Sequence, residues 1–188
     1  IRNCLVGSEM CIRDSSPILL KGIGLGGWML QEPYMMQSIG GAKNQQEYRS
    51  KLELLIGETK TQQFYDAWLD NFVTAQDIDS IASWGFNSVR LPMHYNLFTL
   101  PIEDEPDSNT NTWLAKGFDM VDALLSWCEA NELYLILDLH AAPGGQGYDQ
   151  GISDYDTNKP SLWESEQNKV KTVALWGELA KRYHDKQW

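Results

Sequence analysis

The sequence predicts an α/β fold in which about three parallel strands alternate with amphipathic helices, as at the start of a β/α barrel or of a doubly wound sheet. Residues 133–137 are all apolar or aromatic without alternation, which is typical of a strand covered on both faces. Asp138 and His140 then share one face of that strand, since strand side chains repeat every second residue. Residues 143–145 (Pro-Gly-Gly) open a loop at its end, where parallel barrels place their functional residues.

Composition favours a single domain with a core of its own. The 188 residues are 43% hydrophobic and 11% aromatic. A complete eight-stranded barrel takes roughly 250 residues, so the barrel interpretation predicts that only part of it is present. The formal net charge of −11, without a cluster of Lys or Arg, argues against a nucleic-acid partner. No apolar run approaches the roughly 20 residues of a membrane span, and no signal-peptide pattern occurs in the sequence.

The first sixteen residues differ from the rest of the chain. They show no hydrophobic period and resemble translated sequencing-adapter read-through. We therefore expect residues 1–16 to be a non-native or disordered leader and residues 17–188 to form the domain; the alternative is a genuine irregular N-terminal arm. Cys4, Cys11 and Cys128 lack metal-ligand spacing, and Cys128 lies on the apolar stripe of a predicted helix, where it would pack in the core.

From Pro17 onward, periodicity and helix-breaking residues divide the chain into alternating elements. Thr74 and Asp77 can form a capping box at a helix start, and Pro92 is expected to end a strand. The glycines at 24, 26 and 27 lack the spacing of a dinucleotide-binding loop. We expect strands at 18–25, 86–92 and 133–140, and helices at 45–71 (broken near Gly57, with a stripe of Leu52, Leu55 and Ile56), 74–85, 118–128 and 170–183 (with Val170, Val173, Ala174, Trp176, Ala180 and Tyr183).

Two polar side chains on neighbouring predicted strands carry the chemistry. Arg90, opposite Val89 and Leu91, and His140 would meet at the edge where parallel strands end. An Arg there can orient an ionised carboxylate through two parallel hydrogen bonds. The alternatives are a structural ion pair of Arg90 with Asp138 and a purely structural His140.

Three longer motifs, in this order, resemble glycoside hydrolase family 5, and most closely its cellulase-like and exo-glucanase-like members. The likeness runs from about residue 21 to residue 183. It implies the N-terminal part, about three β/α units, of a (β/α)8 TIM barrel that hydrolyses β-glycosidic bonds with retention and needs no cofactor. The motifs are KGIGLGGWMLQEPY (21–34), GFNSVRLP (85–92) and LDLHAAPGGQ (137–146), supported by SLWE (161–164) and LWGELAKRY (175–183).

The resemblance also implies where the catalytic groups lie. Family members use one Glu after strand four as acid/base and another after strand seven as nucleophile, both of which would fall beyond Trp188. The Asn-Glu-Pro motif of the acid/base does not occur in these residues. We therefore expect this chain alone to be inactive, and its partners to be the C-terminal half of its own barrel and a β-linked glycan, β-glucan above others. The family also implies a secreted or periplasmic location.

The resemblance also implies roles for individual residues, according to their positions in the motifs. Arg90 corresponds to the arginine that hydrogen-bonds the nucleophile, and His140 to a histidine lining the subsite beside the scissile bond. Glu32 and Asp149 match exo-glucanase positions that contact sugar hydroxyls, although the loop before Asp149 is one residue shorter than usual. Further candidates are His94 and Tyr95, which match no defined role, and Trp28, which follows the first predicted strand and could stack on a sugar.

Two other functions remain open at this point. A non-catalytic carbohydrate-binding protein could keep the rim of the barrel without its carboxylates. A metal-dependent barrel hydrolase would use His94 and His140 as ligands, but the spacing of the three histidines fits no metal motif, and we expect no metal site.

Overall fold

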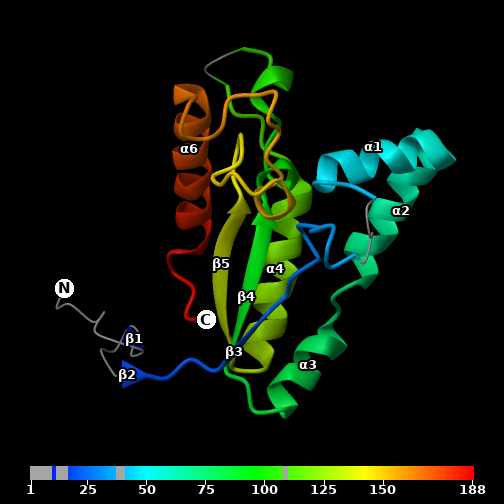
Figure 1. Ribbon diagram of the computed structural model, residues 1–188. Coiled ribbons are helices and arrows are strands. Elements are labelled where there is room, and N and C mark those ends of the chain that lie inside the picture. The colour runs from blue at the N-terminus through cyan, green and yellow to red at the C-terminus, as the bar shows by residue number, and fades with distance from the viewer. Residues whose placement is uncertain (1–9, 12–16, 37–40, 108–109) are drawn as a thin grey trace.

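In the computed structural model, a parallel sheet of three strands forms the centre of the fold (Figure 1). The structure describes residues 10–11, 17–36, 41–107 and 110–188. The strands lie in the order β3 (Gly22–Gly24), β4 (Ser88–His94) and β5 (Tyr134–Ala141). Arg90 is in register with Gly24 on one side and with Ile136 on the other. The predicted parallel α/β arrangement is therefore confirmed.

Helices connect the three strands of the sheet. A short antiparallel pair, β1 (Met10–Cys11) and β2 (Pro17–Ile18), precedes the sheet. The other residues of the expected leader lie outside the described part, so its nature stays a prediction. The helices are α1 (Gln45–Ile56), α2 (Glu58–Asn71), α3 (Ala75–Ser83), α4 (Ala115–Ala130), α5 (Gln150–Ser153) and α6 (Glu166–Tyr183), with 3₁₀ turns η1 (Tyr95–Leu97) and η2 (Ile102–Asp104).

Strand β4 passes through Pro92, which corrects the expectation that this proline ends it. The carbonyl of Arg90 accepts a hydrogen bond from Leu25 N (2.8 Å), so the backbone polar groups of residue 90 point toward the β3 side. Residue 92 has the same orientation, and β3 has ended by that level. The N–H that proline lacks would have had no strand partner there, so its absence costs no ladder hydrogen bond. The first strand is also shorter than the expected 18–25, because Ile18 pairs in β2.

The two faces of the sheet differ. Val89 and Leu91 are fully buried in the core, whereas Arg90, between them, is exposed, as their alternation predicted. Helices α4 and α6 run alongside the strands (Figure 1) and contribute Leu124, Leu175 and further core side chains. The opposite face is open: Ile136 on β5 is 38% exposed. The expectation of a strand covered on both faces is therefore wrong for β5 in this structure.

The helical boundaries follow local signals. The capping box forms, with Thr74 N donating to Asp77 Oδ2 (2.8 Å), and Gly57 separates α1 from α2 with a φ of +83° that favours glycine. Cys128 lies in the core, as predicted, and burial raises the pKa of its thiol to about 12.

The apolar stripes predicted for α1 and α6 are not the buried ones, whereas the stripe predicted for α4 is buried. In α1 no residue is buried, and Leu55 of the expected stripe is 78% exposed. In α6 the outward-facing residues Val170, Val173 and Trp176 are exposed. The buried face of α6 consists of Asn168, Lys171, Leu175 and Leu179. Periodicity located these helices, but their orientation depends on which neighbours surround them.

Candidate active site

Arg90, Asp138 and His140 form one group on the open face of the sheet. Arg90 Nη2 lies 2.5 Å from Asp138 Oδ2 and 3.1 Å from His140 Nδ1, while His140 Nδ1 is 2.9 Å from the same Asp138 oxygen. Arginine only donates hydrogen bonds, so Nδ1 can either accept from Arg90 or donate to Asp138, but not both. The structure thus brings Arg90 and His140 together, as the sequence predicted. Arg90 also forms the ion pair with Asp138 that was the alternative prediction.

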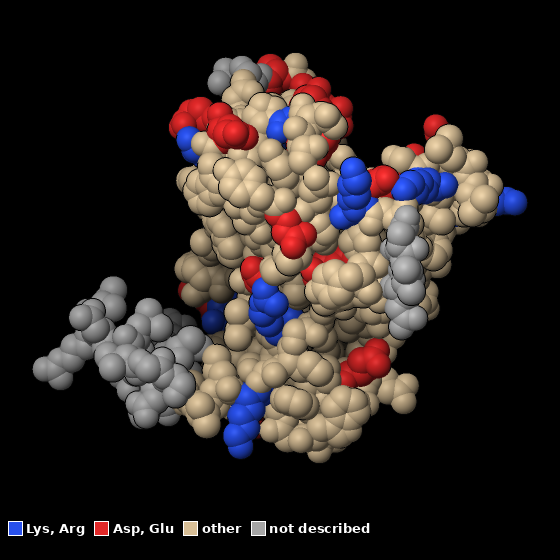
Figure 2. Space-filling model, viewed as in Figure 1, with Lys and Arg blue, Asp and Glu red and all other residues tan. Residues whose placement is uncertain are grey.

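The group is partly accessible. The side chains of Arg90, Asp138 and His140 are 46%, 27% and 22% exposed. Figure 2 shows basic and acidic atoms side by side on this face, and acidic side chains gathered at the end of the molecule where the loops after β4 and β5 lie. A carboxylate that approached Arg90 from the open side would therefore meet a guanidinium already oriented by Asp138.

A second acidic group follows β3. Glu32 is 3% exposed, and its carbonyl accepts from Met35 N (2.9 Å). Partial desolvation, a hydrogen bond to the Glu32 carboxylate and the negative charges of Glu32 and Asp149 raise the pKa of the Tyr34 hydroxyl. Tyr34 itself is 64% exposed. Glu32 and Asp149, which are 117 positions apart in the sequence, thus both raise the pKa of the Tyr34 hydroxyl. Tyr34 was not among the residues predicted for the site, although the motif 21–34 ends on it.

The loop after β5 holds Asp149 in place. Gly144 has a φ of +79°, and a Cβ there would lie 2.2 Å from Asn168 Nδ2, so only glycine fits. Gln146 Oε1 accepts from Ala142 N (3.0 Å), and Asp149 Oδ1 accepts from Gly151 N (3.0 Å) at the start of α5. The glycines in this loop therefore allow it to pack closely against Asn168 of α6.

Trp28, predicted as a contact for substrate, lies in the core. It is 2% exposed, and its Nε1 donates to Leu69 O (2.8 Å). Trp68 Nε1 in turn donates to Gly27 O (2.9 Å). This reciprocal pair attaches the 25–36 segment to α2.

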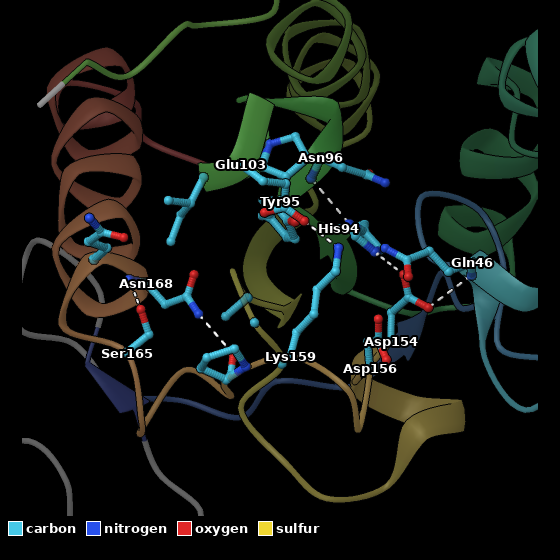
Figure 3. Close-up of a pocket in the computed structure, with 17 residues that line it drawn as sticks. Gln46, His94, Tyr95, Asn96, Glu103, Asp154, Asp156, Lys159, Ser165 and Asn168 are labelled. Atoms are coloured by element: carbon cyan, nitrogen blue, oxygen red, sulfur yellow. Dashed lines mark hydrogen bonds and ion pairs between the residues drawn. The ribbon is translucent and has the colours of Figure 1, made fainter. Parts of the chain in front are cut away.

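His94 and Tyr95 lie apart from Arg90, beside a cavity of about 570 Å³ between the loops after β4 and β5 and the start of α6 (Figure 3). His94 is 2% exposed and bonds Asp154 Oδ2 through Nε2 (2.9 Å). Burial and the charges of Glu103, Asp154 and Asp104 raise the pKa of Tyr95. Lys159 pairs with Glu103 at the same cavity.

No metal site is formed by the described residues: no three His, Cys, Asp or Glu side chains there are grouped as ligands. His94 is engaged with Asp154, and His140 lies beside the Arg90 guanidinium, which would repel a cation. Within the same part of the chain, no helix is long and apolar enough to cross a bilayer.

Comparison with known proteins decides the family. The family described as Cellulase (glycosyl hydrolase family 5) matches residues 45–188. The chain belongs to glycosyl hydrolase family 5. The chain is similar to a β-xylosidase of Phanerodontia chrysosporium, 34% identical over 182 residues, which cover 97% of this chain and 36% of the relative.

Other relatives carry related names. Endoglucanase C of Acetivibrio thermocellus is 35% identical over 122 residues, covering 65% of this chain and 32% of that protein. A probable glucan 1,3-β-glucosidase A of Aspergillus clavatus is 30% identical over 168 residues, covering 88% and 37%. The chain thus spans about a third of the length of these relatives.

A solved structure supports the fold. The rutinosidase of Aspergillus niger superposes with a TM-score of 0.62 at 19% identity, covering 86% of this chain and 43% of that one. Together with the family match, this likeness implies a TIM-barrel-like fold, of which the three parallel strands and their helices form a part. The doubly wound alternative is thereby set aside.

Proposed function

We propose that the protein containing this chain is a retaining glycosidase that cleaves O-glycosidic bonds in a β-linked glycan, with β-glucan as the expected substrate. The observation that carries the proposal is the Arg90–Asp138–His140 group on the open face of two neighbouring parallel strands. Family 5 membership and the names of the relatives support the reaction class.

In this proposal Arg90 orients the nucleophilic carboxylate. Its guanidinium can donate two charge-assisted hydrogen bonds, which keep the nucleophile ionised and aligned with the anomeric carbon. The Asp138 carboxylate holds the guanidinium through an ion pair, with Oδ2 2.5 Å from Arg90 Nη2. His140, with its ring 22% exposed on the same face, lines the subsite beside the scissile bond.

Glu32 and Asp149 are proposed to accept hydrogen bonds from sugar hydroxyls, with Tyr34 beside them. Carboxylates suit this role because each offers several acceptor positions. The shared effect of Glu32 and Asp149 on Tyr34 supports a single binding region for all three.

The catalytic glutamates are proposed to lie beyond Trp188. Retention requires two carboxyl groups about 5 to 5.5 Å apart, one that protonates the leaving oxygen and one that attacks the anomeric carbon. On this proposal residues 1–188 alone are inactive and need the remainder of the barrel, and the whole protein acts outside the cytoplasm, secreted or periplasmic, without a cofactor.

The test is an assay of the full-length protein on β-1,3- and β-1,4-glucans and on aryl β-glucosides and β-xylosides, with the first-formed anomer followed by NMR. The expected result is hydrolysis that releases the β-anomer. Release of the α-anomer would contradict the retaining mechanism. Glycan binding without hydrolysis would favour the non-catalytic alternative, and loss of activity with a chelator would favour the metal-dependent one.

A further inference from the structure

His94 and Asp154 form a buried pair next to the candidate site. Their side chains are 2% and 4% exposed. Because His94 Nδ1 accepts from Asn96 N (3.1 Å), the ring proton lies on Nε2, which donates to Asp154 Oδ2 at 2.9 Å. Asp154 adopts a left-handed backbone conformation (φ +51°), which is uncommon outside glycine and indicates that its surroundings hold it there.

The second oxygen of Asp154 binds a helix start. Oδ1 accepts from Gln46 N (3.0 Å) in the first turn of α1, where backbone N–H groups lack partners within the helix and the helix dipole favours a negative charge. Asn44 caps the same turn and donates through Nδ2 to Tyr155 O (3.2 Å). One carboxylate therefore joins the end of β4, the loop after β5 and the start of α1 (Figure 3).

The connection continues to Glu32. Gln45, the first residue of α1, accepts through Oε1 from Gln31 N at 2.6 Å, and Gln31 is 2% exposed. Glu32 is the next residue. Asp149 and Asp154 cap the two ends of the short helix α5, which follows β5. Both acidic residues of the binding region are thus attached to elements that Asp154 holds together.

His94 and Asp154 line the cavity, and their side-chain polar atoms are hydrogen-bonded to each other and to the backbone N–H groups of Asn96 and Gln46. The pair therefore stabilises the positions of the segments that it joins. We propose that Asp154, held by His94, is a positioning residue that places Glu32 and Asp149 against the substrate by fixing the start of α1 and the loop after β5. This proposal rests on the proposed function, in which Glu32 contacts the sugar.

The first test measures hydrogen exchange in the full-length protein. Asp154→Ala removes both hydrogen bonds, whereas Asp154→Asn keeps an acceptor for Gln46 N and guards against a variant that fails to fold. We expect exchange in residues 25–36 to rise about tenfold in Asp154→Ala, as for the loss of one charge-assisted hydrogen bond, and less in Asp154→Asn. The matched control is Glu105→Ala, which breaks an equally buried ion pair with Lys171 (4% and 3% exposed) and should affect residues 99–112 but not 25–36.

The second test is a double-mutant cycle with Glu32→Gln. We expect Asp154→Ala to raise KM about tenfold in the wild type and by a smaller factor in the Glu32→Gln background, where only the part of its effect that acts through Asp149 remains. Glu105→Ala should change KM by the same factor in both backgrounds. Unchanged exchange in residues 25–36, or an equal effect of Asp154→Ala in both backgrounds, would overturn the inference. If the wild type hydrolyses no glycan, the proposed function fails, while the exchange measurement still decides whether Asp154 holds the Glu32 segment.

Discussion

Arg90 is arranged to deliver a fixed positive charge to the open face of the sheet. Its Nη2 atom contacts both Asp138 and His140, and neighbouring side chains on β4 and β5 keep this geometry because they belong to regular strands. In the proposed function, an arginine placed in this way acts on the nucleophilic carboxylate more than on the distant parts of a substrate.

We therefore expect Arg90→Ala in the full-length protein to lower kcat about a hundredfold and to change KM much less, since the lost contact acts in the transition state. Arg90→Lys should recover only part of the rate, because lysine lacks the planar fork. Steady-state kinetics on an aryl β-glucoside measures both. A change confined to KM would instead assign Arg90 to substrate binding.

Glu32→Gln should lower the pKa of Tyr34. The substitution removes one negative charge and a strong acceptor, while the desolvation that is the largest cause of the shift remains, so the pKa should fall yet stay above its ordinary value of 10. Ultraviolet pH titration measures the change, with Tyr34→Phe subtracted to isolate this phenol. An unchanged titration would show that Glu32 does not interact with Tyr34.

Helix α6 is attached to the loop after β4 by a buried ion pair. Lys171 pairs with Glu105, which also accepts from Thr112 N at 3.0 Å. Burial alone would raise the pKa of Glu105, but the bonds from Lys171 and Thr112 outweigh it and lower that pKa below its ordinary value. A polar pair thus lies on the buried face of α6, which also carries Leu175 and Leu179.

Lys171→Met should reduce the free energy of unfolding by about 3 kcal/mol, because it leaves the Glu105 carboxylate buried without its cation. Since the pKa of Glu105 is lower in the folded than in the unfolded state, its contribution is present above the ordinary pKa of glutamate and is lost as the pH falls through the lowered value. Urea unfolding at pH 7 and at pH 3 measures both effects. Lys169→Met, which removes an exposed pair with Glu166 on the same helix, is the control and should cost less than about 1 kcal/mol.

The whole molecule leaves apolar surface uncovered along one side. Val170, Val173 and Trp176 of α6 are 59%, 71% and 40% exposed, and β5 is the last strand of the described sheet. In a closed barrel the following β/α unit would cover such a helix face and pair such an edge.

The 188-residue chain expressed alone should therefore associate or be poorly soluble, which sedimentation velocity measures. Replacing Val170, Val173 and Trp176 together by Gln should reduce the association. Replacing Leu54 and Leu55, which are 89% and 78% exposed on α1, should not. A monomer with a cooperative thermal transition would contradict the expectation.

Local sequence patterns were enough to predict the alternation of strands and helices, the capping box at Thr74 and the shared face of Asp138 and His140, because periodicity and caps depend on local backbone geometry. They also identified Arg90 and His140 as neighbours, since parallel strands end at one edge. Local patterns could not predict that Trp28 is buried, that His94 pairs with Asp154 across 60 positions, or that α6 turns Lys171 inward. Those features depend on which distant segments meet, and neither a residue's type nor its spacing specifies its partners across the fold.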